Sequence, residues 1–186
     1  SNRKFLSWSE SPDGCYDYTK ASGKTIYLSK SKITHLYAVW YYDYSRKING
    51  GSLNGGSRTF DTAYVDQFET TVGNFYRVMG YCWIPGTLPD KTKANWDKYP
   101  IQATNIFRIF DYCNTLSRLL GYTKCYTQSG TWNGNNATTE MNCNKTNTGY
   151  RLPDKDEWFY YASDTGFYGS ESYPYTGGKP VGDVAW

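Results

Sequence analysis

Apolar residues recur at helical spacing in three segments of the chain. The clearest helix follows Thr104 or Asn105, either of which can cap its first turn, and it ends before Gly121. Its apolar side chains fall at three- and four-residue steps and form one face, made of Ile106, Phe107, Phe110, Cys113, Leu116 and Leu120. The position of Cys113 on that face predicts a buried, small hydrophobic residue.

Two shorter helices are also predicted. One is expected to begin after Thr70 or Thr71, whose hydroxyls can cap it, and to end near Met79, with Gly80 as terminator. Strand-like alternation is predicted at residues 5–8, 25–28, 33–40 and 63–68.

The third helix follows Asp154, which has the capping-box spacing to Glu157. Trp158, Tyr161 and Ala162 are expected to face the core from this helix.

Length and charge exclude several classes of protein. The chain has 186 residues and 39% apolar content, which suffices for one large domain or a domain with a short appendage. Its longest wholly apolar run, 36–42, is far too short to span a bilayer. A net charge of +3 from nearly balanced signs gives no basic arm, so no nucleic-acid partner is expected.

Aromatic content is the unusual quantity, with 20 Tyr, 8 Phe and 7 Trp. A β-rich domain with few leucines needs aromatic residues in its core, whereas tyrosine is also common in binding surfaces. The excess as a whole favours a binding surface. Candidate ligand-binding residues in loop-like segments are Trp83, Trp96, Trp132, Tyr173 and Tyr175, with core or loop packing as the alternative for each.

The cysteine and histidine content argues against catalysis and metal binding. There are five cysteines without a C-x-x-C pair and one histidine, His35, so no zinc site or nucleophile–histidine pair is predicted. His35 is interpreted as structural. Cys125 and Cys143 flank a polar segment at 127–148, and a disulfide between them would contribute about 3 kcal/mol. In an exported protein this pairing is expected, with two free thiols as the alternative.

The first forty residues resemble a known surface module. Phe5-Leu6-Ser7-Trp8, Pro12-Asp13-Gly14 and Leu36-Tyr37-Ala38-Val39-Trp40 are similar to the second half of a Listeria–Bacteroides repeat, the β-grasp-like module of internalin B-type proteins. The resemblance implies a stalk on a secreted protein. Residues 43–59 are polar and glycine-rich and are interpreted as a linker. The predicted division is therefore 1–42, 43–59 and 60–186.

Three later segments resemble the formylglycine-generating-enzyme (sulfatase-modifying-factor) domain. Residues 65–71 are similar to its strand-to-helix opening, and 99–101 with 111–117 to its "P-V … Y-C-N-x-L-S" helix. Residues 149–158 are close to its "G-Y-R-L-P-T-E-A-E-W" signature, which includes Arg151, Glu157 and Trp158. The resemblance implies an α+β, C-type-lectin-like fold with short strands, two to three helices and long irregular loops.

The given chain ends at Trp186, where the family's domain continues. The family carries its calcium ligands and, in true oxidases, its reactive cysteine pair in that later part. No cofactor is therefore expected within this chain, and calcium is expected only together with the missing C-terminal part.

The resemblance implies a non-catalytic binder, because many members use the scaffold to display a ligand-binding surface. Variable proteins of diversity-generating retroelements are one such group. The expected partner is a protein or carbohydrate at a bacterial surface or in the periplasm, with membrane attachment only through a lipid anchor or stalk outside this chain. The alternative is an oxidase that converts a substrate cysteine to formylglycine with copper and oxygen. A binder that stacks nucleic acid is disfavoured by the low charge.

Overall fold

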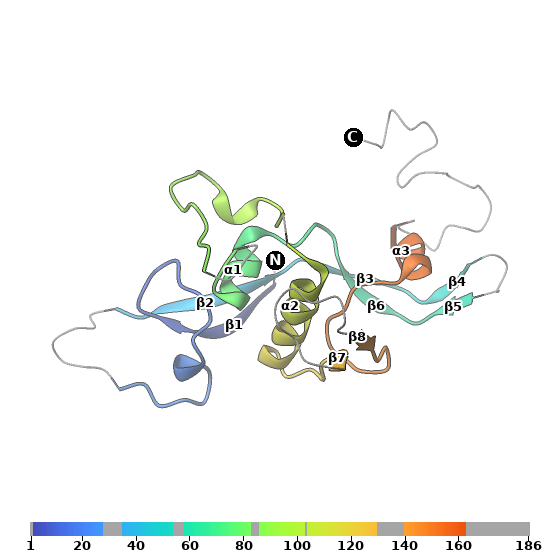
Figure 1. Cartoon of the computed structure of the whole chain (residues 1–186), viewed down its shortest axis with the longest axis horizontal. Coiled ribbons are helices and arrows are strands. Elements are labelled where there is room, and N and C mark those ends of the chain that lie inside the picture. Colours follow the sequence, from blue (N-terminus) through green and yellow to red (C-terminus); the bar gives the residue numbers. More distant parts are fainter. Residues whose placement is uncertain are drawn as a thin grey trace. The chain divides into compact units, whose positions relative to one another are not determined.

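The computed structural model describes residues 2–27, 35–53, 58–82, 86–102, 104–129 and 140–162. Short strands alternate along the chain with three α-helices and short 3-10 turns (Figure 1). The elements are β1 (Asn2–Ser9), η1 (Tyr18–Lys20), β2 (Tyr37–Asp43), β3 (Ser45–Ile48), β4 (Gly51–Leu53), β5 (Arg58–Phe60), β6 (Ala63–Asp66), α1 (Val72–Met79), η3 (Trp96–Lys98), α2 (Ile106–Leu119), β7 (Tyr126–Ser129), β8 (Glu140–Cys143) and α3 (Lys155–Ala162).

The chain divides into two compact units. The first contains Ser1–Asp43 and Phe68–Arg151, and the second contains Tyr44–Gln67 and Leu152–Trp186. This differs from the predicted division into a module at 1–42, a linker at 43–59 and a domain from residue 60. Strands β3 and β4 lie within the predicted linker, because β3 finds an antiparallel partner in β6 and β4 finds one in β5.

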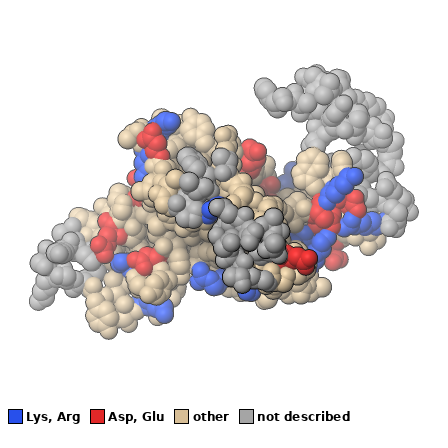
Figure 2. Space-filling view, in the orientation of Figure 1, with Lys and Arg blue, Asp and Glu red and all other residues tan. Residues whose placement is uncertain are grey.

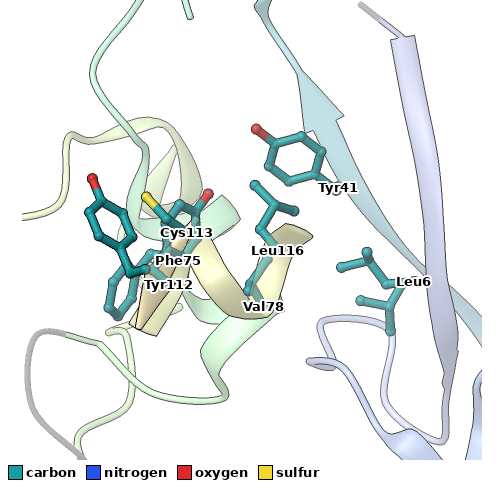
Figure 3. Close-up of a cluster of buried hydrophobic side chains, with 9 residues drawn as sticks. Leu6, Tyr41, Phe75, Val78, Tyr112, Cys113 and Leu116 are labelled. Carbon is teal, nitrogen blue, oxygen red and sulfur yellow. The ribbon is translucent and has the colours of Figure 1, made fainter. Parts of the chain in front are cut away.

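The core of the first unit joins the β1–β2 ribbon to α1 and α2. Strands β1 and β2 pair antiparallel, with an irregularity between Phe5 and Ser7. In Figure 3, side chains from the ribbon and from both helices converge on the same cluster. Its buried members are Leu6, Val39, Tyr41, Phe75, Val78, Tyr112, Cys113, Leu116 and Tyr126. The N-terminal strands therefore share one core with the helices, and Cys113 is buried there as predicted.

Helices α1 and α2 begin and end where the sequence predicts. The Thr71 hydroxyl accepts a hydrogen bond from the Asn74 amide at 3.1 Å, and α1 ends at Gly80 with φ of 78°. At α2 the Asn105 side chain accepts from the Arg108 amide at 3.1 Å. These caps satisfy backbone donors that would otherwise lack partners at a helix start.

The second unit is built from two strand pairs and α3. Tyr160 on α3 stacks on Phe60 of β5 with ring centroids 4.6 Å apart, and its hydroxyl donates to the Asn49 carbonyl at 2.9 Å. A Cβ at Gly51 would clash with the Tyr160 hydroxyl, so glycine lets this side chain approach the strand closely. Arg58 on β5 pairs with the carboxylates of Asp154 and Asp156.

Helix α3 has the predicted cap but a different buried face. The Asp154 amide donates to Glu157 Oε2 and the Glu157 amide donates to Asp154 Oδ1, each at 2.9 Å, which is a complete capping box. The helix buries Glu157 and Tyr160. Trp158 is 54% exposed, so its predicted place in the core is wrong in this structure, because the rotation of α3 is set by the Tyr160 stack.

Two further differences concern strands. Residues 25–27 have no regular structure, although a strand was predicted there. Conversely, the flanks of the predicted polar excursion pair as β7 and β8, from Tyr126 opposite Cys143 to Ser129 opposite Glu140. Residues 130–139 lie outside the described chain.

Candidate ligand-binding surface

An open depression of about 680 Å³ lies in the first unit, between the segment that follows β1 and helix α1. Its lining is mixed polar and aromatic and consists of Ser9, Glu10, Ser11, Gly14, Cys15, Tyr16, Asp17, Tyr18, Lys20 and Tyr76. The Tyr18 side chain is 68% exposed at this surface. Concave surfaces with aromatic walls and a few polar groups are typical of ligand sites.

Backbone hydrogen bonds hold this segment on both sides. The Tyr16 amide donates to the Arg77 carbonyl of α1 at 2.7 Å, and the Asp17 amide donates to the Ser7 hydroxyl of β1 at 3.1 Å. A Cβ at Gly14 would lie 1.9 Å from Ser9 Oγ, so the chain turns at a point where only glycine fits. The wall of the depression is therefore fixed by the scaffold.

The charged groups of the wall are paired with one another. The Lys20 ammonium lies 2.6 Å from Asp17 Oδ2 and 3.5 Å from Glu10 Oε1. The Asp17 carboxylate also accepts hydrogen bonds from the Thr19 hydroxyl and amide. These bonds, above all the one from Lys20, lower the pKa of Asp17, so the carboxylate is ionised at neutral pH.

Tyr76 contributes the α1 side of the depression. The Lys91 ammonium lies 3.4 Å from the Tyr76 hydroxyl and 4.5 Å from the centroid of the Tyr76 ring. Burial is the main cause of a raised pKa for Tyr76, so its hydroxyl stays protonated and available as a donor.

Of the predicted binding residues, the structure describes Trp96. This residue begins η3 and is half-buried, with its ring 6.1 Å from that of Tyr76. The Arg77 and Lys91 cations lie over the indole at 5.9 and 5.6 Å, and Arg77 also pairs with Asp97 at 3.2 Å. Trp96 therefore packs its loop onto α1, which is the packing alternative considered for it. Trp83, Trp132, Tyr173 and Tyr175 lie outside the described residues.

The predicted disulfide between Cys125 and Cys143 is not formed. Both thiols are free, Cys125 being fully buried and Cys143 exposed. The register explains this, because Cys143 lies opposite Tyr126, so the side chain of its neighbour Cys125 points to the other face of the hairpin. The Cys125 sulfur instead lies 3.3 Å from the Gly149 carbonyl oxygen.

The lining of the depression does not include the three signature residues. Arg151 is half-buried. Burial raises the pKa of the Cys125 thiol, and the positive charge of Arg151 partly offsets this rise. Glu157 closes the capping box of α3, and Trp158 is exposed on that helix. Their described contacts are structural ones.

Charges of both signs are intermixed over the face drawn in Figure 2. Within the described part of the chain, no group of three or more histidine, cysteine or acidic side chains is arranged to hold a metal ion. Among the same residues, no helix has the length and apolar character needed to cross a membrane.

No profile of a known protein family and no curated protein matches the chain. A solved structure, Treponema denticola variable protein 1, has a similar fold, with a TM-score of 0.54 and 19% identity over 75% of this chain. The chain spans 57% of that protein's length. At this identity the likeness shows the fold alone. The described chain is mixed α/β with three helices and short strands, consistent with the C-type-lectin-like fold of that protein. The sequence and family comparisons do not support a formylglycine-generating-enzyme domain.

Sequence reasoning missed the depression itself. Its lining comes from residues 9–20 and from Tyr76, which lie on opposite sides of the β2–β6 segment in the sequence. The available local signals were the turn at Pro12-Asp13-Gly14 and the Asp17–Lys20 spacing. Neither signal indicates that α1 completes the surface.

Proposed function

We propose that this chain is an exported, non-catalytic ligand-binding protein that displays aromatic loops on a C-type-lectin-like scaffold. The observation that carries the proposal is the fold shared with Treponema denticola variable protein 1. We place the protein at a bacterial surface or in the periplasm and assign it to the functional class of diversity-generating-retroelement variable proteins.

The physical support is the contrast between a fixed scaffold and irregular connections. Capped helices and a buried aromatic cluster hold the first unit together. Exposed tyrosines outside the helices and strands include Tyr27, Tyr99 and Tyr122. Tyrosine gives a large contact area at low entropic cost. Such a scaffold tolerates changes in its loops without loss of folding.

The chemistry of the depression suits a polar ligand with one flat or apolar face. The exposed Tyr18 ring offers a stacking surface. Hydrogen-bond donors are present in the Tyr76 hydroxyl and the Lys20 ammonium, and the ionised Asp17 is an acceptor. Sugars and short peptide segments have this combination of faces. The proposed ligand is therefore a protein or a carbohydrate at the cell surface.

The proposal is tested by selection followed by affinity measurement. The purified chain is screened on a glycan array and against a phage-displayed library of linear peptides. Each selected ligand is then measured on the wild type, on Tyr18→Ala, and on the Trp132→Ala/Tyr175→Ala double variant. At least tenfold weaker binding is expected for Tyr18→Ala, and the double variant measures what the two loop aromatics add.

Tyr64→Ala is the matched control, because Tyr64 is a 72% exposed tyrosine on β6 and does not line the depression. It is expected to leave the affinity unchanged. Equal affinities across all variants would contradict the proposal, as would the selection of no ligand from either library. Conversion of a cysteine in a test peptide to formylglycine in the presence of copper and oxygen would replace it with the oxidase alternative.

A further inference from the structure

The structure brings Cys15 and Cys82 to one small cluster. Cys82 is fully buried together with Val72 and Tyr76. Cys15 is half-buried, packs against the same cluster, and also lines the open depression. The Cys15 thiol is therefore partly accessible to solvent, whereas the Cys82 thiol is buried.

The backbone around the two cysteines is held in place. The amide of Tyr16, next to Cys15, donates to the Arg77 carbonyl at 2.7 Å. A Cβ at Gly80, two residues before Cys82, would lie 3.5 Å from Cys15 Sγ. The Cys15 sulfur thus lies against the end of α1, where the chain leads directly into Cys82.

Tyr76 lies beside both cysteines. Its side chain is buried together with Cys82, and Cys15 packs against that same cluster from the side of the depression.

We propose that Cys15 and Cys82 form the disulfide of this chain under oxidising conditions, with Cys15 as the accessible attacking thiol and Cys82 as the buried resolving thiol. In the structure both are free thiols. The bond would tie the wall of the depression to the end of α1. It would form whether or not the depression binds a ligand.

The oxidation needs a small-molecule disulfide, such as glutathione disulfide, as electron acceptor. The Cys15 thiolate attacks one sulfur of that disulfide and releases one glutathione thiolate. The Cys82 thiolate then attacks the Cys15 sulfur of the mixed disulfide, which forms the Cys15–Cys82 bond and releases the second glutathione thiolate. The two protein thiol protons pass to the released thiolates, so two protein thiols and one disulfide give one protein disulfide and two glutathione molecules.

The test is peptide mapping of the folded chain after treatment with glutathione disulfide. Remaining thiols are blocked with N-ethylmaleimide at acidic pH, and the protein is digested with trypsin without reduction. Trypsin separates the two cysteines into peptides 5–20 and 78–91, whereas Cys125 and Cys143 share peptide 125–145. We expect peptides 5–20 and 78–91 to be recovered as one cross-linked species, lighter than their sum by two hydrogen atoms.

Thermal unfolding gives the second readout. Oxidation is expected to raise the Tm of the wild type by about 5–10 °C, because the bond closes a long loop of the unfolded chain. Cys15→Ser should lose both the cross-linked species and the Tm rise. Cys143→Ser, which removes the exposed thiol, should keep both.

The proposal is overturned if both peptides are recovered singly with blocked thiols after oxidation. It is equally overturned if either is linked to a different cysteine peptide in the folded protein. A disulfide found only within peptide 125–145 would overturn the proposal in favour of the pairing of Cys125 with Cys143.

Discussion

The Asn74 side chain closes two hydrogen bonds with the backbone of Tyr42. Its Oδ1 accepts from the Tyr42 amide at 3.1 Å, and its Nδ2 donates to the Tyr42 carbonyl at 2.8 Å. Asn114 of α2 makes the same pair of bonds to Tyr126, at 3.1 and 2.9 Å. Each of the two helices thus satisfies both backbone groups of one strand residue with a single amide side chain.

Asn74→Ala is therefore expected to destabilise the chain by about 2–4 kcal/mol. Asn74 is 4% exposed, so the substitution removes two hydrogen bonds to the Tyr42 backbone in a protected environment. Urea unfolding followed by circular dichroism measures the change. Asn142→Ala, at an exposed position on β8, is the control and should stay within about 0.5 kcal/mol of the wild type. Equal losses of unfolding free energy in both variants would show that the two Asn74–Tyr42 hydrogen bonds contribute nothing specific to stability.

The capping box of α3 predicts a difference between two substitutions at one position. Glu157→Ala removes the acceptor for the Asp154 amide and is expected to cost about 1 kcal/mol or more. Glu157→Gln keeps an acceptor oxygen and should retain most of that stability. The comparison uses the free energy of unfolding at pH 7, and a loss as large for glutamine as for alanine would argue against the capping role.

Gly14 predicts a steric effect with a designed rescue. Gly14→Ala places a methyl group 1.9 Å from Ser9 Oγ and 2.4 Å from Ser9 Cβ, and the overpacking is expected to cost about 1–3 kcal/mol. Ser9→Gly removes both obstructing atoms, so the double variant should recover most of the loss. A double variant as unstable as Gly14→Ala alone would place the strain elsewhere.

The burial of Cys82 predicts a loss of stability in alkaline solution. Burial, partly offset by the charge of Lys91, raises the pKa of Cys82 from 9.0 to about 11. Above pH 9 the unfolded chain loses this proton while the folded chain keeps it. The stability that the protonated Cys82 thiol contributes to the folded chain is therefore fully present below pH 9 and is lost as the pH rises through about 11.

In the presence of dithiothreitol, the wild type should lose up to about 1.4 kcal/mol of stability per pH unit in that window from Cys82. Cys82→Ala should show a slope shallower by that amount, whatever its stability at pH 7. Parallel slopes for the two proteins between pH 9 and pH 11 would refute the assignment of the lost proton to Cys82.

Local signals in the sequence predicted local structure well. Thr71, Asn105 and the Asp154–Glu157 pair cap the three helices as expected, because a cap depends only on residues within one turn. The apolar face of α2 likewise places Cys113 and Leu116 in the core, since helical periodicity is a local property.

Features that depend on distant partners were not predictable in this way. Strands β3 and β4 lie in a polar, glycine-rich part of the sequence. They form because β6 and β5 pair with them and Tyr160 packs on β5. Trp96 lies in a loop-like segment but is held on α1 by cations from elsewhere in the chain. The depression requires Tyr76 beside residues 9–20, a proximity that no local pattern records.

The most direct test of the central claim is the equilibrium affinity of a selected ligand for Tyr18→Ala compared with Tyr64→Ala. Both variants remove an exposed tyrosine of the described surface, but only Tyr18 lines the depression. Biolayer interferometry on proteins with matched circular dichroism spectra should show at least a tenfold higher Kd for Tyr18→Ala and a wild-type Kd for Tyr64→Ala. Identical Kd values for the two variants would contradict ligand binding at this surface.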